Sequence, residues 1–401
     1  MTLKSIPLIL ALSACILFSC SDDNDVPSAV QKLDIELDVH QRSIRDKGND
    51  FANTLLIQAS KEDDNVLLSP LSLQFVLCMI ANGADEEAYT ELLNTLGLAD
   101  YSLEELNAFH QTVLEGIGNN SEKLGFSLNN AVWVQEGFSV NDSFLDKMKS
   151  CYNASVGYLD FGQVEYAKKA INEWASQATN STIKDLQLPL NASTKLVLNN
   201  ACCFDGQWSF PFDEKKTQEG DFMCGDGSVA RVKFMQSKED MTYVAQDGYA
   251  QVVIGFSNGF SMLVALPDEG KTLEEVLPLV DWMSPKNLDC VTVDLKLPKF
   301  ELNLVKNLNK TLQEMDICRI YASGSLPNLA DNLAVSLIQQ NTSMSIDESG
   351  VKASVTTSGT MDPTAGELSV VKMELNRPFA FAIRENSSKT LFFVGKVACF
   401  K

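Results

Sequence analysis

Histidine is nearly absent from this 401-residue chain, which contains only His40 and His110. Both lie in polar stretches of helical character, and we expect both side chains to face solvent. The G-x-S-x-G, P-loop and H-E-x-x-H motifs are also absent. The carboxylate pair at 347–348 stands beside a glycine with no nucleophile nearby. These absences make a hydrolase a poor fit, and we expect neither an enzyme nor a bound cofactor.

Paired metal-ligand motifs are missing as well. No C-x-x-C occurs among the ten cysteines, and no histidine lies close enough to complete a zinc pattern, so we expect no metal site. We expect most of the cysteines after Cys20 to be small buried hydrophobic residues. Disulfides are possible in an exported protein, but the sequence assigns no pairing. The eight residues are Cys78, Cys151, Cys202, Cys203, Cys224, Cys290, Cys318 and Cys399.

Basic residues are scarce. The chain has 32 Lys and Arg against 53 Asp and Glu. Loss of residues 1–19 would remove one Lys and leave a formal charge of −22. Such a surface repels phosphate backbones, which argues against a nucleic-acid partner.

Long apolar runs are absent except near the N-terminus. The run "IPLILALSACILF" at 6–18 is too short to span a bilayer comfortably and predicts a secretory signal. Residues 17–20 resemble a bacterial lipobox, in which Cys20 is acylated and becomes the mature N-terminus. An ordinary signal peptide cut nearby is the alternative. We expect residues 1–19 to be removed and attachment to the outer membrane by the lipid alone.

The segment "SDDND" at 21–25 follows directly. Its charges favour a solvated tether, which we assign to residues 20–38. The segment also resembles the acidic signal of surface-exposed lipoproteins in Bacteroides and relatives. The outer face of the outer membrane is therefore favoured over the inner face.

Helical patterns come first along the remaining chain and strand patterns later, which favours an α+β fold in one domain over residues 39–401. Ser69 followed by Pro70 predicts a capped helix start. Helices are predicted near 42–60, 69–84, 86–97 and 165–179, and strands at 196–204, 251–256, 260–267, 291–302, 379–385 and 390–400.

One further strand pattern lies at the root of a loop. From Val351 to Ser358 apolar and polar residues alternate, which is typical of a strand with one buried face. The apolar residues are small, and the run continues into the loop-forming residues Gly359, Asp362 and Pro363.

Several separated segments resemble one family, the serpins. They follow one another in the family's order and cover essentially the whole mature chain. The segments are "NVLLSPLSLQFVLCMIANGA" (65–84), "AINEWASQATNSTIKDL" (170–186), "LVLNNACCFDGQWSFPFD" (196–213), "FSMLVALP" (260–267), "LKLPKFEL" (295–302) and "NRPFAFAIRENSSKTLFFVGKV" (376–397).

The resemblance implies a large central sheet A, further sheets B and C, about eight to nine helices and an exposed reactive-centre loop at about 346–376. It also implies a suicide-substrate inhibitor of serine proteases. The target cleaves the loop and becomes an acyl-enzyme, and the loop then inserts into sheet A. We expect a monomer that forms a covalent 1:1 complex with its target. The alternatives are a non-inhibitory surface binding module and an inhibitor of papain-like cysteine proteases.

The family's mechanical sites carry over by position. Val351 and Lys352 depart from the common threonine and glutamate of the hinge, and Gln340 replaces the usual shutter histidine. The implied sites are a hinge of Glu348, Gly350, Val351, Ala353, Val355 and Thr357, a shutter of Ser69, Ser72, Asn200 and Gln340, and a breach tryptophan, Trp208.

The cleaved bond follows from counting along the loop. About fourteen positions from Gly350 lead to Thr364–Ala365, and counting back from Pro378 leads to Glu367–Leu368, while Met361 is a further alternative. The window 361–368 contains no Lys or Arg, so a trypsin-like pocket would leave its buried carboxylate unpaired. We therefore expect an elastase-like or subtilisin-like target.

Overall fold

The structure is a computed structural model of the whole chain. It describes residues 32–400 except 63, 119–125, 180, 182–184, 187, 205, 284, 286–288 and 351–369.

The described residues form eight α-helices and fourteen strands. The helices are α1 (Val39–Ala59), α2 (Pro70–Ala81), α3 (Glu86–Thr95), α4 (Leu103–Ile117), α6 (Asp142–Tyr152), α7 (Val164–Ala178), α8 (Leu273–Val276) and α9 (Asn309–Gln313). The strands are β1 (Val66–Leu68), β2 (Phe126–Gln135), β3 (Ser155–Leu159), β4 (Leu196–Phe204), β5 (Gln218–Met223), β6 (Val229–Gln246), β7 (Tyr249–Gly255), β8 (Phe260–Pro267), β9 (Asp289–Pro298), β10 (Phe300–Asn307), β11 (Gln339–Ile346), β12 (Val371–Glu374), β13 (Phe379–Glu385) and β14 (Leu391–Val397).

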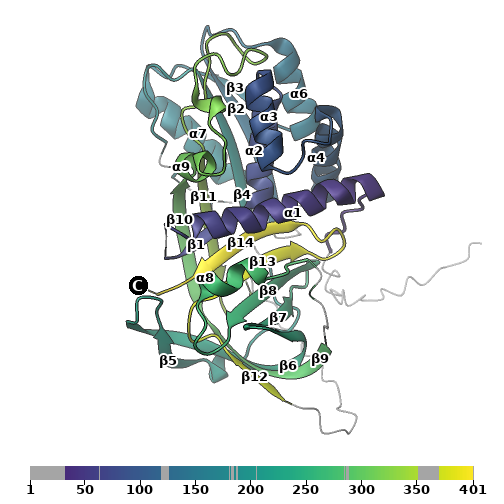
Figure 1. Cartoon of the computed structure of the whole chain (residues 1–401). Helices are drawn as coiled ribbons and strands as arrows, with labels where there is room; N and C mark the ends of the chain where they lie inside the picture. The colour runs from purple at the N-terminus through teal and green to yellow at the C-terminus, as the bar shows by residue number, and fades with distance from the viewer. Residues whose placement is uncertain are drawn as a thin grey trace, which may run out of the picture.

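The strands make three hydrogen-bonded sheets. One has nine strands in the order β1-β14-β13-β8-β7-β6-β9-β12, with β5 added on β6. The others are β3-β2-β4 and β10-β11, and they lie next to each other at β4 and β11. Helix α1 crosses the middle of the molecule over β14, with the other long helices around β2, β3 and β4 (Figure 1). The α+β prediction is confirmed. The expected large central sheet A corresponds to β3-β2-β4 together with β10-β11, and no ladder joins these two parts among the described residues.

The predicted elements are present, with one split. The single strand expected at 291–302 is two strands, β9 and β10, in different sheets. The break falls at Pro298 and Lys299, where proline lacks the N–H that a continuing ladder needs. Helices α4 and α6 and strands such as β2, β3 and β6 were not predicted from the sequence.

The start of α2 follows the prediction. Ser69 is the N-cap, its hydroxyl accepts a hydrogen bond from Ser72 N, and Pro70 occupies the first turn. Eleven of the twelve residues of α2 are buried, so this helix lies in the centre of the core.

The expectation of two solvent-facing histidines is wrong for His110. Its side chain is fully buried among the rings of Phe75, Phe109 and Tyr152, with ring centroids 4.4, 5.5 and 5.3 Å away. No described group hydrogen-bonds its two ring nitrogens. Burial lowers the pKa of His110 from 6.5 to about 3. His40 is exposed and lies 2.8 Å from Glu105.

The assignment of residues 20–38 to a solvated tether also needs correction. Leu33, Ile35 and Leu37 are each no more than 5% exposed and belong to the main hydrophobic core. The acidic residues between them are exposed, so the segment has the alternation of a strand with one buried face. The folded part therefore begins before residue 39.

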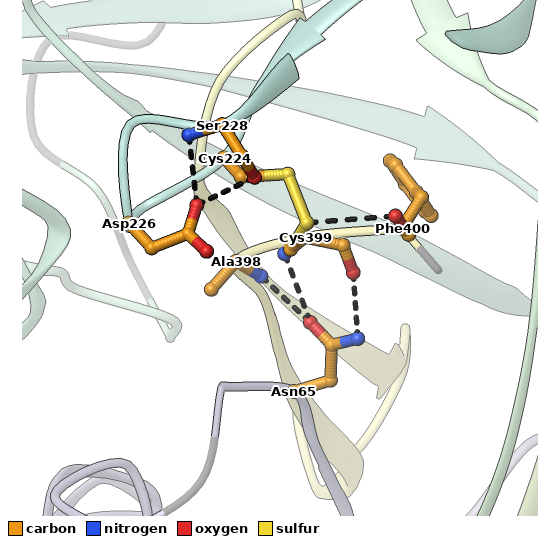
Figure 2. The surroundings of a disulfide bond; sticks show 7 residues. All are labelled: Asn65, Cys224, Asp226, Ser228, Ala398, Cys399 and Phe400. Atoms are coloured by element: carbon orange, nitrogen blue, oxygen red, sulfur yellow. Dashed lines mark hydrogen bonds between the residues drawn. A yellow bond between two sulfur atoms is a disulfide. The ribbon is translucent and has the colours of Figure 1, made fainter. Parts of the chain in front are cut away.

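One disulfide joins Cys224, at the tip of the β5–β6 hairpin, to Cys399 near the C-terminus (Figure 2). The Asn65 side chain holds the same tail through Ala398 N at 2.8 Å and Cys399 O at 2.7 Å. Cys78, Cys202 and Cys203 are buried as expected, whereas Cys290 and Cys318 are exposed. No helix of the described residues is long and apolar enough to cross a membrane.

Acid should destabilise the protein through His110. The unfolded chain binds a proton at His110 below pH 6.5, whereas the folded chain resists protonation down to about pH 3. Stability from this residue is therefore full above pH 6.5 and falls by up to about 1.4 kcal/mol per pH unit below it. We expect His110→Leu to flatten the fall in urea midpoint between pH 7 and pH 4.5. Equal slopes in His110→Leu and the unmodified protein would contradict this.

The disulfide should contribute strongly to stability. It links residues 175 positions apart. Closing a loop of that length is worth up to about 5 kcal/mol by restricting the unfolded chain. We expect the double change Cys224→Ser and Cys399→Ser to lower the urea midpoint clearly, while Cys318→Ser, an exposed free thiol, has no effect. An unchanged midpoint in the double variant would refute the contribution.

Candidate functional site: the seam between β4 and β11

The central feature is a seam, which we define as the line where β4 and β11 lie side by side. No backbone ladder joins the described residues of these strands. Strand β4 pairs only with β2, and β11 pairs only with β10. Each strand therefore has one edge without backbone hydrogen bonds to a neighbouring strand, and that edge faces the other strand. Edges of this kind can pair with an additional strand.

The two strands are fastened to the start of α2 instead of to each other. On the β11 side, Gln340 Oε1 accepts from Ser69 N at 3.1 Å and Gln340 Nε2 donates to Ser69 O at 2.8 Å. On the β4 side, the Ser72 hydroxyl donates to Asn200 Oδ1. The four predicted shutter residues are therefore together beneath the seam.

Asn130 extends this polar cluster to the third strand. Asn200 Nδ2 donates to Asn130 Oδ1 at 2.8 Å, and the buried Asn130 amide donates to Tyr152 O at 2.8 Å. Asn130 is not among the predicted shutter residues, because strand β2 was not predicted from the sequence. The available signal was the recurrence of large apolar residues at even positions of 126–135, namely Phe126, Leu128, Val132 and Val134, on the same parity as Asn130.

Trp208 lies just beyond the end of β4, next to the turn that follows β11. It is 2% exposed and stacks on Phe256 with ring centroids 4.3 Å apart. Its indole N–H donates to Asp347 O at 2.9 Å, and its backbone N–H donates to Ser349 O at 3.0 Å. Trp208, the predicted breach residue, thus holds the chain that leaves β11.

That chain reverses direction in a tight turn. Asp347 N donates to Gly350 O at 3.0 Å, and Gly350 N donates to Asp347 O at 3.2 Å. Gly350 also forms an antiparallel bridge pair with Gln207, just beyond the end of β4. Gly350 therefore lies between the extensions of both strands.

Only glycine fits this position. Gly350 has φ +120°, and a Cβ there would lie 2.3 Å from Gly206 O and 2.7 Å from Trp208 N. The requirement for glycine at this position thus has a steric cause.

Glu348 is clamped beside the turn. One carboxylate oxygen lies 2.6 Å from Lys299 Nζ and the other accepts from Thr217 Oγ1 at 2.7 Å. Burial alone would raise the pKa of Glu348, but the hydrogen bonds from Lys299 and Thr217 outweigh it and lower the pKa. The same hydrogen bond raises the pKa of Lys299. Sequence patterns carried no signal for Lys299 or Thr217.

The chain re-enters the described fold at a different sheet. Strand β12 pairs in parallel with β9, and Glu374 lies 2.7 Å from Lys296 Nζ. Several predicted site residues lie outside the described residues. They are Cys20, the hinge residues Val351, Ala353, Val355 and Thr357, and the reactive-bond residues Met361, Thr364, Ala365, Glu367 and Leu368.

The sequence matches one protein family over most of its length. The family model described as "Serpin (serine protease inhibitor)" matches residues 46–400. The chain belongs to the serpin family. Its members are generally protease inhibitors and not enzymes, which confirms the expectation from the sequence that this protein is not an enzyme.

Similar proteins come from organisms as different as a mammal and a plant. Serpin A3-1 of Bos taurus is 29% identical over 93% of both chains, and Serpin-Z10 of Arabidopsis thaliana is 28% identical over 83% of this chain and 91% of the relative. The solved structure of the thermophilic serpin tengpin in its native state has a TM-score of 0.79 and 27% identity, over 92% of this chain and 96% of tengpin. These similarities confirm the serpin fold.

The Lys299–Glu348 pair should stabilise the hinge at neutral pH. Glu348 has a lowered pKa, so its contribution is present above its ordinary value of 4.5 and is lost as pH falls through the folded value. We expect Lys299→Met to lower the free energy of unfolding at pH 7 by about 1–3 kcal/mol. Lys296→Met, which breaks the more exposed pair with Glu374, should cost less than about 1 kcal/mol.

Urea unfolding at pH 7 and pH 3.5 measures both variants. The deficit of Lys299→Met should shrink at the lower pH, because the unfolded chain binds a proton at Glu348 below the ordinary pKa of 4.5 and the contribution of the pair falls. A deficit of equal size at both pH values would show that the lost charge pair is not its cause.

Proposed function

We propose that this serpin inhibits serine proteases by inserting its cleaved reactive-centre loop into the seam. The proposal rests on the position of Gly350. This residue pairs with Gln207, beyond the end of β4, and with Asp347, beyond the end of β11, and no ladder joins the facing edges of these two strands among the described residues. A strand growing from Gly350 would find partners on both sides.

Continuing the two registers supports the assignment of the loop's inward face. The Asp347–Gly350 and Gln207–Gly350 pairs, extended residue by residue, place every odd-numbered loop residue opposite an even-numbered residue of β11. Those β11 residues, from Gln340 to Ile346, are its buried ones. Inserted in this register, Ala353 would face Met344 and Phe204, Val355 would face Thr342 and Cys202, and Thr357 would face Gln340 and Asn200.

The inserted strand would supply the driving force. The serine hydroxyl of the protease attacks the scissile carbonyl, the C–N bond breaks, and the amine of the downstream fragment leaves with the proton. The acyl ester stays on the loop. Each backbone hydrogen bond that the loop gains is worth about 1 kcal/mol net, so a dozen provide on the order of 10 kcal/mol. That is comparable with the whole stability of a typical enzyme domain, so the trapped active site can be distorted before the ester is hydrolysed.

The loop composition supports an elastase-like or subtilisin-like target. We place the cleaved bond at Thr364–Ala365, with Met361, Glu367 and Leu368 as alternatives, because 361–368 lacks Lys and Arg. A trapped papain-like protease would carry a thioester in place of the ester. A non-inhibitory binding module is the remaining alternative. Among the solved serpin structures, thyroxine-binding globulin in complex with thyroxine has a TM-score of 0.78 and 26% identity.

We further propose that the protein is a monomeric outer-membrane lipoprotein attached through Cys20 and exposed on the cell surface. The lipobox-like ending at 17–20 and the acidic residues at 21–25 support this. Labelling with a radioactive fatty acid, with and without Cys20→Ser, tests the anchor. Protease accessibility on intact cells tests the exposed face.

Mixing the protein with pancreatic elastase, subtilisin, papain and trypsin tests the inhibitory function. We expect a complex with elastase or subtilisin that survives boiling in detergent, together with a released C-terminal peptide whose mass identifies the cleaved bond. Loop cleavage by every protease without a complex would instead favour the binding module.

The register makes a parity prediction. Val355→Glu should place a charge on the buried face of the inserted strand and convert the inhibitor into a substrate, with complex yield falling at least about tenfold. Ser354→Glu introduces the same charge on the outward face and should leave complex yield nearly unchanged. Densitometry of complex against cleaved protein measures both. Equal losses in the two variants would refute the register.

A further inference from the structure

The buried N-terminal segment, residues 33–37, lies against the turn between β7 and β8. Leu33 N donates to Asn258 O at 2.8 Å. A Cβ on Gly259, which has φ +93°, would lie only 2.7 Å from Leu33 O. The segment and the turn are therefore in direct backbone contact, closer than any residue with a side chain at 259 would allow.

On its other side the same turn contacts residues 207–209 around Trp208, which we call the breach. Ser257 N donates to Gln207 O at 2.8 Å, and Ser209 N donates to Gly255 O at 2.8 Å. Phe256, next to the turn, carries the stacked ring of Trp208. Gln207 is also the residue that bridges to Gly350. A continuous backbone path thus runs from Leu33 through the turn and Gln207 to the hinge.

The far side of the segment is held firmly. Ile35 N donates to Ser387 Oγ at 2.9 Å, and Asn386 N donates to Gly259 O at 2.9 Å. The Ile35 side chain packs on α4, where a Cβ on Gly116 would lie 3.0 Å from Ile35 Cγ1. The β7–β8 turn is therefore fixed between the N-terminal segment, the β13–β14 turn and the breach.

We propose that residues 33–37 position the breach and act as a brake on opening of the seam. A new strand between β4 and β11 must take up a spacing of about 4.8 Å on each side, so β4 has to swing away from β11 about its extension at Gln207, which already pairs with Gly350. Residues 33–37 hold the turn to which Gln207 is bonded and so resist that movement. Leu33 and Ile35 are positioning residues, since neither touches the loop that enters. The inference concerns opening of the seam and rests on the proposed insertion only for its role in inhibition.

Uptake of a fluorescent synthetic peptide of loop sequence 351–360 tests the brake in the full chain. We expect the double change Leu33→Ala and Ile35→Ala to accelerate uptake about fivefold or more, the factor that about 1 kcal/mol produces. Asp34→Ala, on the exposed face of the same segment, should not change the rate.

Leu92→Ala is the matched control for general destabilisation. Leu92 is also fully buried, but it lies on α3, which packs on α2 and on the short turn Arg319–Tyr321. We expect this variant to lose thermal stability with less than about a twofold change in uptake. Equal acceleration in Leu92→Ala and the double variant, or no acceleration in the double variant, would overturn the proposal.

If the double variant fails to fold, Leu33→Val takes its place with a smaller truncation. Hydrogen exchange at the Ser257 and Trp208 amides then serves as a second readout. Faster exchange at both amides in Leu33→Val, but not in Leu92→Ala, is the expected result, and unchanged exchange would contradict the brake. If the variants change peptide uptake as predicted but the protein traps no protease, the brake would be supported and the proposed inhibitory function would be refuted.

Discussion

The structure depends on where β4 and β11 find their hydrogen bonds. Both strands are fastened to the first turn of α2, one through Gln340 and Ser69 and the other through Asn200 and Ser72. Because the described residues of these strands share no ladder, separating them does not first require a row of backbone bonds to break. The polar cluster satisfies buried groups while the seam is closed, and hydroxyl and amide groups can accept new partners when it opens.

The hinge gives this seam a direction. The turn at Asp347–Gly350 brings the chain back over the seam, and the Gln207 bridge aligns it with β4. Glycine is the only residue that fits at the point of closest approach. Lys299 and Thr217 hold Glu348 at the side of the turn, next to Gly350, where the proposed insertion would begin.

Short sequence patterns predicted features that depend on residues close together in the chain. Ser69 with Pro70 marked the start of α2, whereas the hinge at Gly350 was implied only by resemblance to the serpins. Resemblance to the serpins located Trp208, Asn200 and Gln340, which no local pattern identifies. The burial of His110, the Cys224–Cys399 pairing and the Lys299–Glu348 contact join residues far apart in the chain. Helical spacing around His110 fits a solvent face and a buried face equally well, and only packing against Phe75 and Tyr152 decides between them.

The N-terminal segment shows how tertiary packing redefines a boundary. The acidic segment at 21–25 led to the assignment of residues 20–38 as one solvated tether, yet the apolar residues that alternate with the acidic residues at 34, 36 and 38 are buried. A charged alternation and a strand with one wet face have the same composition, so composition cannot separate them. The distinction has a mechanical consequence, because a flexible chain would leave the β7–β8 turn unsupported on one side. A segment held by Asn258 and Ser387 instead completes the enclosure of the turn that carries the breach.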